Sequence, residues 1–122
     1  LESLINKFSI KAPNSKAEIS TLSGGNMQKL LMGRELISNP EVIIASQPTR
    51  GLDVNAVEAI HNLLVEQRDK GSAILMISED LDELFKLSNR IHVMFEGKIV
   101  KSFNIDDADI NNVGLAMAGI VE

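Results

Sequence analysis

The 122-residue sequence contains no cysteine, tryptophan or tyrosine, and its only aromatic residues are four phenylalanines. Without cysteine there is no disulfide, no cysteine-ligated zinc site and no thiol nucleophile. So few aromatic residues cannot form a stacking surface for single-stranded nucleic acid. The net charge of −5 is opposite in sign to that of a general nucleic-acid binder, so we expect no nucleic-acid partner.

Long apolar runs are also missing from this sequence. No stretch approaches the roughly 18 apolar residues of a membrane-spanning helix, and no basic leader with an apolar core indicates a signal peptide. The two histidines, His61 and His92, lie far apart in the sequence and suggest no metal pair. We expect His61 on the surface of its helix and a structural role for His92 on the outer side of its strand. With 44% hydrophobic and 24% charged residues, the composition is that of one modest soluble, intracellular domain.

Alternating helix and strand signals predict an α/β fold. Helices are predicted at residues 24–38 and 54–70, from Ser78 onward and at 107–118, and strands at 42–45, 73–77, 90–95 and 98–103. The strands at 42–45 and 73–77 are continuously apolar, which predicts a parallel sheet buried on both faces. Glu96-Gly97 separates the last two strands and predicts a hairpin.

The segment from Leu22 to Lys29, Leu-Ser-Gly-Gly-Asn-Met-Gln-Lys, carries the main chemical signal. Gly24 and Gly25 at the start of a helix expose backbone N–H groups, and Ser23 adds a hydroxyl. Together with the helix dipole these groups form an anion site suited to phosphate. Ser-Gly-Gly is also a common sequence in loops. This segment by itself is therefore also compatible with an ordinary helix start that binds no phosphate.

Further segments follow in a fixed order. They are Pro-Thr-Arg-Gly-Leu-Asp at 48–53, Ile-Ser-Glu-Asp-Leu at 77–81, Asn-Arg-Ile at 89–91 and Val-Met-Phe-Glu-Gly-Lys-Ile-Val at 93–100. The whole series resembles the C-terminal part of an ATP-binding cassette (ABC) ATPase. It is most similar to the second cassette of the tandem ATPase subunits of sugar and nucleoside importers. Asn26 and the Thr-Arg-Gly-Leu-Asp sequence favour that branch.

This resemblance implies a partial P-loop NTPase fold, with a mainly parallel sheet, flanking helices and a C-terminal β-hairpin plus helix. Residues 1–39 correspond to a remnant of the helical signature subdomain and residues 40–122 to the C-terminal half of the ATPase core. No G-x-x-x-x-G-K-[S/T] motif is present, so the P-loop strand is absent and we expect a piece of a longer subunit. The strands flanking the missing one, at 73–77 and 91–95, could pair directly, bind another chain or keep the family's positions with a gap between them. We expect direct pairing or binding of another chain, because bare strand edges are costly in a core.

The resemblance also implies that this half carries a degenerate catalytic site. Ser46 and Gln47 stand where the family has the magnesium-binding aspartate and the catalytic glutamate, and Glu79 stands at the switch histidine. Serine is a poor substitute for an anionic ligand near a hard cation, and glutamine cannot act as a general base. We therefore expect no ATPase activity from this chain alone. Engineered replacement of the two carboxylates is an alternative, although Glu79 argues against it as the whole explanation.

The cofactor-binding residues implied by the resemblance act on a partner's site. Ser23, Gly24, Gly25 and Asn26 would contact ATP bound by another cassette, and Asp53 would cross the dimer interface. Asp53 also has the position of a helix N-cap, and both roles are compatible. ATP and magnesium are expected in the full assembly, with neither tightly bound to this chain.

The function implied is that of an importer's ATPase subunit, which couples ATP binding and hydrolysis to solute uptake. The implied partners are the first cassette of the same subunit, or its dimer mate, and a transmembrane permease. The implied location is the cytoplasmic face of the membrane. The alternative is a non-catalytic, cassette-like scaffold or regulatory module, which the full-length sequence would distinguish by the absence of an intact first cassette and a neighbouring permease.

Overall fold

The computed structural model describes residues 24–121, which form two compact units divided between Ile77 and Ser78. The first unit contains α2 (Gly24–Leu36), β1 (Val42–Ser46), α3 (Val54–Asp69) and β2 (Ala73–Ile77). The second contains α4 (Leu81–Leu87), β3 (Arg90–Phe95), β4 (Lys98–Asn104), the 3₁₀ turn η2 (Ile105–Asp107) and α5 (Ile110–Met117). The expected subdomain boundary at residue 39 refers to a larger cassette and stays a prediction.

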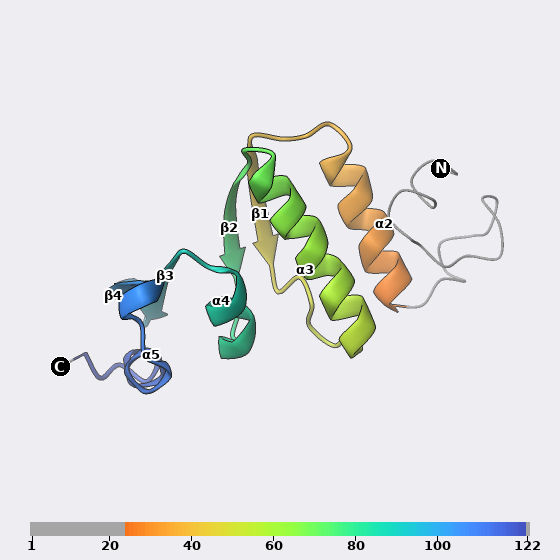
Figure 1. Cartoon of the computed structure of the whole chain (residues 1–122). Coiled ribbons are helices and arrows are strands. Elements are labelled where there is room, and N and C mark those ends of the chain that lie inside the picture. Colours follow the sequence, from red (N-terminus) through yellow and green to blue (C-terminus); the bar gives the residue numbers. More distant parts are fainter. Residues whose placement is uncertain (1–23, 122) are drawn as a thin grey trace. The chain divides into compact units, whose positions relative to one another are not determined.

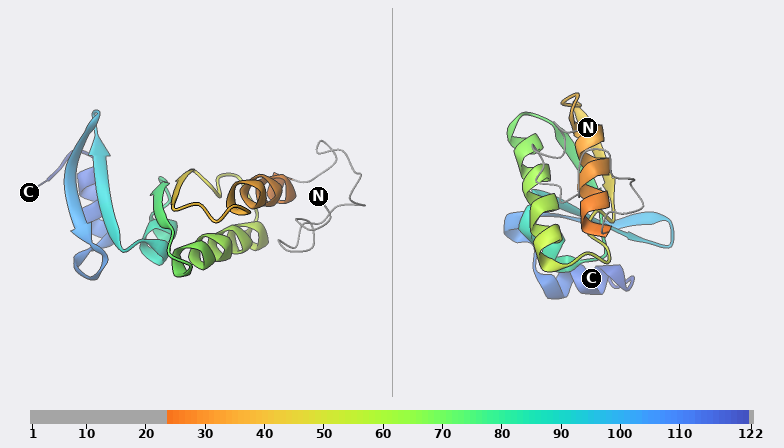
Figure 2. Two further views of the ribbon diagram at one scale, coloured as in Figure 1. Left: turned by 90° about the horizontal axis from the view of Figure 1, so that it is seen from above. Right: turned by 90° about the vertical axis from the view of Figure 1, so that its right-hand side faces the viewer.

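The first unit is built on a β1–α3–β2 crossover (Figure 1). β1 and β2 are parallel, with Val42 opposite Ala73 and Ser46 opposite Ile77, as the apolar runs predict. Helices α2 and α3 run side by side in the same direction (Figures 1 and 2), and both begin at the end where the strands finish (Figure 1). In open α/β sheets this carboxyl end of the strands is where ligands bind.

The β1–β2 sheet is buried on one face only. On the covered face Ala45 is 9% exposed, and Ile60 of α3 is fully buried. On the other face Ile44 is 68% exposed and Leu75 is 54% exposed. The prediction of burial on both faces is therefore wrong within residues 24–77, because the helices described there cover a single side of the sheet.

Helix α3 follows its sequence signals at both ends. Asp53 accepts a hydrogen bond from the Ala56 N–H at 2.8 Å and caps the helix, as predicted. Gly71, with φ of 102°, takes the positive φ that often follows the end of a helix. The prediction that His61 lies on the surface is wrong: the residue is 4% exposed and belongs to the buried part of α3, as does Ile60.

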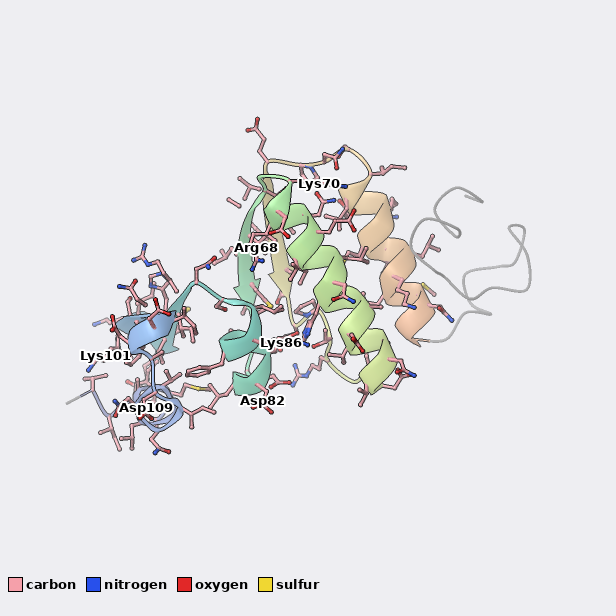
Figure 3. All side chains as sticks on the ribbon, viewed as in Figure 1. Arg68, Lys70, Asp82, Lys86, Lys101 and Asp109 are labelled. Atoms are coloured by element: carbon pink, nitrogen blue, oxygen red, sulfur yellow. The ribbon has the colours of Figure 1, made fainter. Side chains whose placement is uncertain are left out.

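Short-range ion pairs lie at the C-terminal end of α3 (Figure 3). Lys70 Nζ lies 3.0 Å from Glu66 Oε1, and Arg68 Nη2 lies 3.3 Å from Asp69 Oδ1. These side chains are 42–66% exposed, so each pair contributes little stability. The basic groups complement the negative end of the helix dipole and lie away from the helix start that concerns the site.

The second unit contains the predicted hairpin of β3 and β4. Phe95 pairs with Lys98, so Glu96 and Gly97 form a two-residue turn with φ values of 49° and 78°. Both values are positive, as a type I′ turn requires. His92 lies on the exposed face, where its Nδ1 is 2.7 Å from Ser102 Oγ on the neighbouring strand; its structural role stays a prediction.

Helices α4 and α5 pack on the hairpin around a small core. Ile91, Val93, Val113 and Ala116 are buried, and Leu81, Leu84 and Phe85 pack against them. The helix starts differ from the prediction: Asp80 rather than Ser78 caps α4, and α5 begins at Ile110 rather than near 107 because η2 precedes it. Asp109 accepts from the Asn111 N–H at 2.7 Å and caps α5.

The strands that were expected to pair directly remain separate. Within residues 24–121, β2 pairs with β1 and β3 pairs with β4, in two two-stranded sheets. Direct pairing of residues 73–77 with 91–95 is therefore wrong. Each short sheet has its own helix contacts and hydrogen-bond ladder. The alternative, in which another chain pairs with these strands, stays a prediction.

Candidate functional site

The start of α2 presents the expected anion-binding groups. Gly24, Gly25 and Asn26 lie in its first turn, which contains no acidic side chain. The first N–H groups of a helix have no partner within the helix and lie at the positive end of its dipole. This arrangement suits a phosphate oxygen. Ser23, the remaining predicted contact, lies outside the described residues.

The loop after β1 is tightly organised. The Gln47 N–H donates to the Ile77 carbonyl at 2.7 Å, which extends the β1–β2 ladder by one bond. The Arg50 N–H then bonds to the Gln47 carbonyl and the Leu52 N–H to the Thr49 carbonyl, at 3.3 and 3.2 Å. Gln47 has φ of 49°, in the left-handed region that a non-glycine residue enters at a cost of about 1–2 kcal/mol.

The loop ends in the only carboxylate of residues 46–53. Asp53 is exposed at the start of α3, and its Oδ1 accepts the bond from the Ala56 N–H. The N-cap prediction is confirmed, and the cap fixes the orientation of this carboxylate. Its predicted role across a dimer interface stays a prediction.

A side-chain hydrogen bond joins α2 to this loop. The Nε2 of Gln28 donates to the Pro48 carbonyl at 2.8 Å, and the bond is partly buried. Gln28 belongs to the Leu22–Lys29 segment, but sequence reasoning did not single it out. The signal available in the sequence was its position one helical turn after Gly24, on the same predicted helix.

The two degenerate positions at the end of β1 contain no acid. Ser46 is exposed opposite Ile77, and Gln47 follows it in the loop. A hydroxyl and an amide are neutral donors, unlike the carboxylates that hold magnesium. Among residues 24–121, no three histidine, cysteine, aspartate or glutamate side chains lie close enough together to hold a metal ion.

Glu79 lies in the second unit and is exposed just before α4. Hydrogen bonds order the turn around it: Ser78 Oγ donates to Glu83 Oε2 at 2.6 Å and accepts from the Asp80 N–H at 3.0 Å. Glu83, in the acidic first turn of α4, is only 3% exposed. The bond from Ser78 satisfies part of this buried carboxylate.

No helix in the described part of the chain is long and apolar enough to cross a membrane. No protein-family model matches the sequence.

Curated relatives are 41–48% identical to this chain over 95–98% of its length. The guanosine import ATP-binding protein NupO of Bacillus subtilis is 48% identical over 117 residues, which are 96% of this chain and 23% of NupO. The glucose import ATP-binding protein TsgD13 of Haloferax volcanii is 42% identical, over 97% of this chain and 22% of that protein. The ribose import ATP-binding protein RbsA of Clostridium perfringens is 44% identical, over 98% and 24%. The chain thus spans about a quarter of the curated relatives it matches.

Solved structures of ABC cassettes share the fold. A nucleotide-free ATP-binding cassette from an ABC transporter is 28% identical with a TM-score of 0.78, over 99% of this chain and 47% of that cassette. An ATP-binding subunit of an ABC transporter, at 20% identity, matches with a TM-score of 0.80 over 97% of this chain and 52% of that subunit. The chain therefore has the fold of about half a cassette, and by its sequence it belongs to the ABC ATPase family.

Proposed function

We propose that this chain is part of the ATP-binding subunit of an ABC importer for a sugar or nucleoside, which couples ATP binding and hydrolysis to uptake. The observation that carries the proposal is the 41–48% identity of almost the whole chain to import ATP-binding proteins. Their names include guanosine, glucose, ribose and nucleoside importers. The partners of this chain are the first cassette of the same subunit, or its dimer mate, and a transmembrane permease, at the cytoplasmic face of the membrane.

The share of each relative that the chain matches supports a parent subunit with two cassettes in tandem. The chain matches 47% of a solved cassette but only 23% of the import protein NupO. The import subunit is thus about as long as two cassettes. We assign this chain to the second cassette because Ser46, Gln47 and Glu79 depart from the catalytic pattern, while the signature segment is intact.

The exposed sheet face supports the view that the remaining half of the cassette packs here. Val42, Ile44, Leu75 and Ile77 are 50–68% exposed on one side of β1 and β2. Contiguous apolar surface of this kind indicates an interaction surface. The solved cassette is about twice as long as the matched region, so its other half provides enough chain to cover this face.

Within this proposal, the residues of α2 bind a phosphate of ATP held by the partner cassette. The backbone N–H groups of Gly24 and Gly25 and the Ser23 hydroxyl stabilise negative charge. Glycine is needed because a side chain would hold the phosphate away from the backbone. The magnesium ion fits poorly at Ser46 and Gln47, which supply no carboxylate, so no step in this half uses the metal.

The test is ATP turnover and solute uptake by the full-length subunit assembled with its permease. We expect Gly24→Asp to abolish most of both activities, since the new carboxylate repels phosphate. Glu35→Gln, on the exposed side of the same helix, is the matched control and should retain both. Full activity of the Gly24→Asp variant would contradict the proposal. The scaffold alternative is not favoured, because the relatives are import ATP-binding proteins.

A further inference from the structure

We propose that Gln28 is a positioning residue that couples the phosphate-binding start of α2 to the loop carrying Asp53. This inference rests on the proposed function, since it assigns a role to a residue beside the same site. The observation behind it is the 2.8 Å bond from Gln28 Nε2 to the Pro48 carbonyl.

The first step in the argument is the rigidity of α2. Gln28 lies one turn after Gly24, at a rise of roughly 6 Å along the axis. A displacement of the first turn, such as one caused by a phosphate on its N–H groups, therefore moves the Gln28 side chain with it. The bond to Pro48 is partly buried, and Pro48 itself is buried, so water does not readily replace this contact.

The second step is the way in which α2 is held elsewhere. Its buried apolar residues, Leu30 and Leu36, lie further along the helix. Apolar packing is non-directional and allows small rotations and slides of a helix. A hydrogen bond depends on both distance and angle. The bond of Gln28 therefore sets the rotation of the first turn relative to the loop more sharply than the leucines do.

The third step is the stiffness of the loop itself. Gln47 is held to Ile77 at one end, and Asp53 caps α3 at the other end, through the Ala56 N–H. Two backbone bonds organise the residues between them. Because both ends are bonded, a force on the Pro48 carbonyl is passed along the loop to Asp53 instead of being absorbed by free backbone rotation.

The experiment measures hydrogen exchange in the full-length subunit, with and without a non-hydrolysable ATP analogue and magnesium. Peptides covering residues 24–30 report on α2, and peptides covering 47–57 report on the loop. In the unmodified subunit we expect the analogue to slow exchange in both regions. In Gln28→Met, which keeps the length but has no donor, we expect slowing at α2 and at least a threefold loss of the slowing at the loop.

Three further variants make the result specific. Gln28→Lys keeps an N–H donor and should restore the loop response at least in part, whereas Gln28→Glu accepts only and should behave like Gln28→Met. Glu35→Gln, exposed on the same helix, should behave like the unmodified subunit. If Gln28→Met unfolds, Gln28→Glu serves as the test of the lost donor.

The outcomes separate the two proposals. A merely structural role for Gln28 would raise loop exchange equally with and without the analogue, and this result would overturn the coupling. The same is true if Gln28→Met keeps the full loop response. If the analogue slows exchange at neither region in the unmodified subunit, the proposed function fails and this inference fails with it.

Discussion

Gly119 lies directly against the ring of Phe95, so that a Cβ on Gly119 would stand 2.7 Å from Phe95 Cε1. The backbone there also has φ of 86°, which an L side chain rarely adopts. This contact attaches the segment after α5 to the end of β3. The glycine is therefore required both by the backbone and by the packing.

We expect Gly119→Ala to destabilise the chain by about 2–4 kcal/mol, from overpacking and from strain at positive φ. Thermal or urea unfolding of the purified chain measures the change. Gly114→Ala is the matched control, because nothing lies within 4 Å of its Cβ position and it lies within α5. It should stabilise the chain by about 0.5–1 kcal/mol. Equal effects of both substitutions would contradict this account of Gly119.

The two roles of Asp53 can be separated by two substitutions. Asp53→Ala removes the bond to the Ala56 N–H and should cost about 1 kcal/mol of stability, whereas Asp53→Asn keeps a capping oxygen and should cost only a few tenths. Both remove the negative charge. If Asp53 also acts across the interface, Asp53→Asn lowers ATP turnover of the assembled importer without a matching loss of stability. Unchanged turnover would leave the cap as its sole role.

The exposed apolar face of the sheet leads to a prediction that depends on the length of the chain. Ile44→Lys should change the stability of this chain by less than about 0.5 kcal/mol, since Ile44 is 68% exposed here. In the full-length subunit the same substitution should cost at least about 2 kcal/mol, because the lysine would be buried beneath the remaining half of the cassette.

The control for this comparison is Val54→Ser, at an 81% exposed position on α3. It should have a small effect in both lengths of chain. Urea unfolding, or retention of folded protein after mild heating, provides the measurement. A small effect of Ile44→Lys in the full-length subunit would show that the β1–β2 face is not covered by the rest of the cassette.

The degenerate site should respond weakly to repair. We expect Ser46→Asp with Gln47→Glu to change the ATP turnover of the full importer by less than about threefold, because Glu79 remains at the switch position. Ser23→Arg should abolish most ATP turnover, because it places a bulky group directly before Gly24, where the phosphate is proposed to bind. Suppose instead that the two carboxylates raise ATP turnover strongly and Ser23→Arg leaves it unchanged. The proposal that this half acts on a partner's site while its own site is degenerate would then be wrong.

This chain by itself should hydrolyse no ATP. It has no G-x-x-x-x-G-K-[S/T] motif, and Ser46 and Gln47 supply neither a metal ligand of the required charge nor a general base. Phosphate release from purified chain and ATP is the measurement. Gly24→Asp provides the control for contamination: turnover that disappears in this variant would contradict the prediction, whereas turnover that persists would come from another enzyme.

Local signals in the sequence were enough to predict the individual elements of the fold. The apolar run at 73–77 became β2, Asp53 became the cap of α3, and Glu96-Gly97 became a two-residue hairpin turn. Each of these depends on a few adjacent residues and their backbone preferences. The resemblance to ABC ATPases likewise depended on ordered short motifs, and the relatives confirm it.

The tertiary structure decided which faces are buried and which distant residues meet. Ile44 and Leu75 look like core residues in the sequence but are exposed, because burial depends on what packs above a strand as well as on its composition. His61 looks like a surface residue in the sequence but is buried, because burial depends on what packs around a side chain as well as on its polarity. The bond between Gln28 and Pro48 joins residues on separate elements, and only the packing of α2 beside the β1–α3 loop brings the amide within reach of that carbonyl.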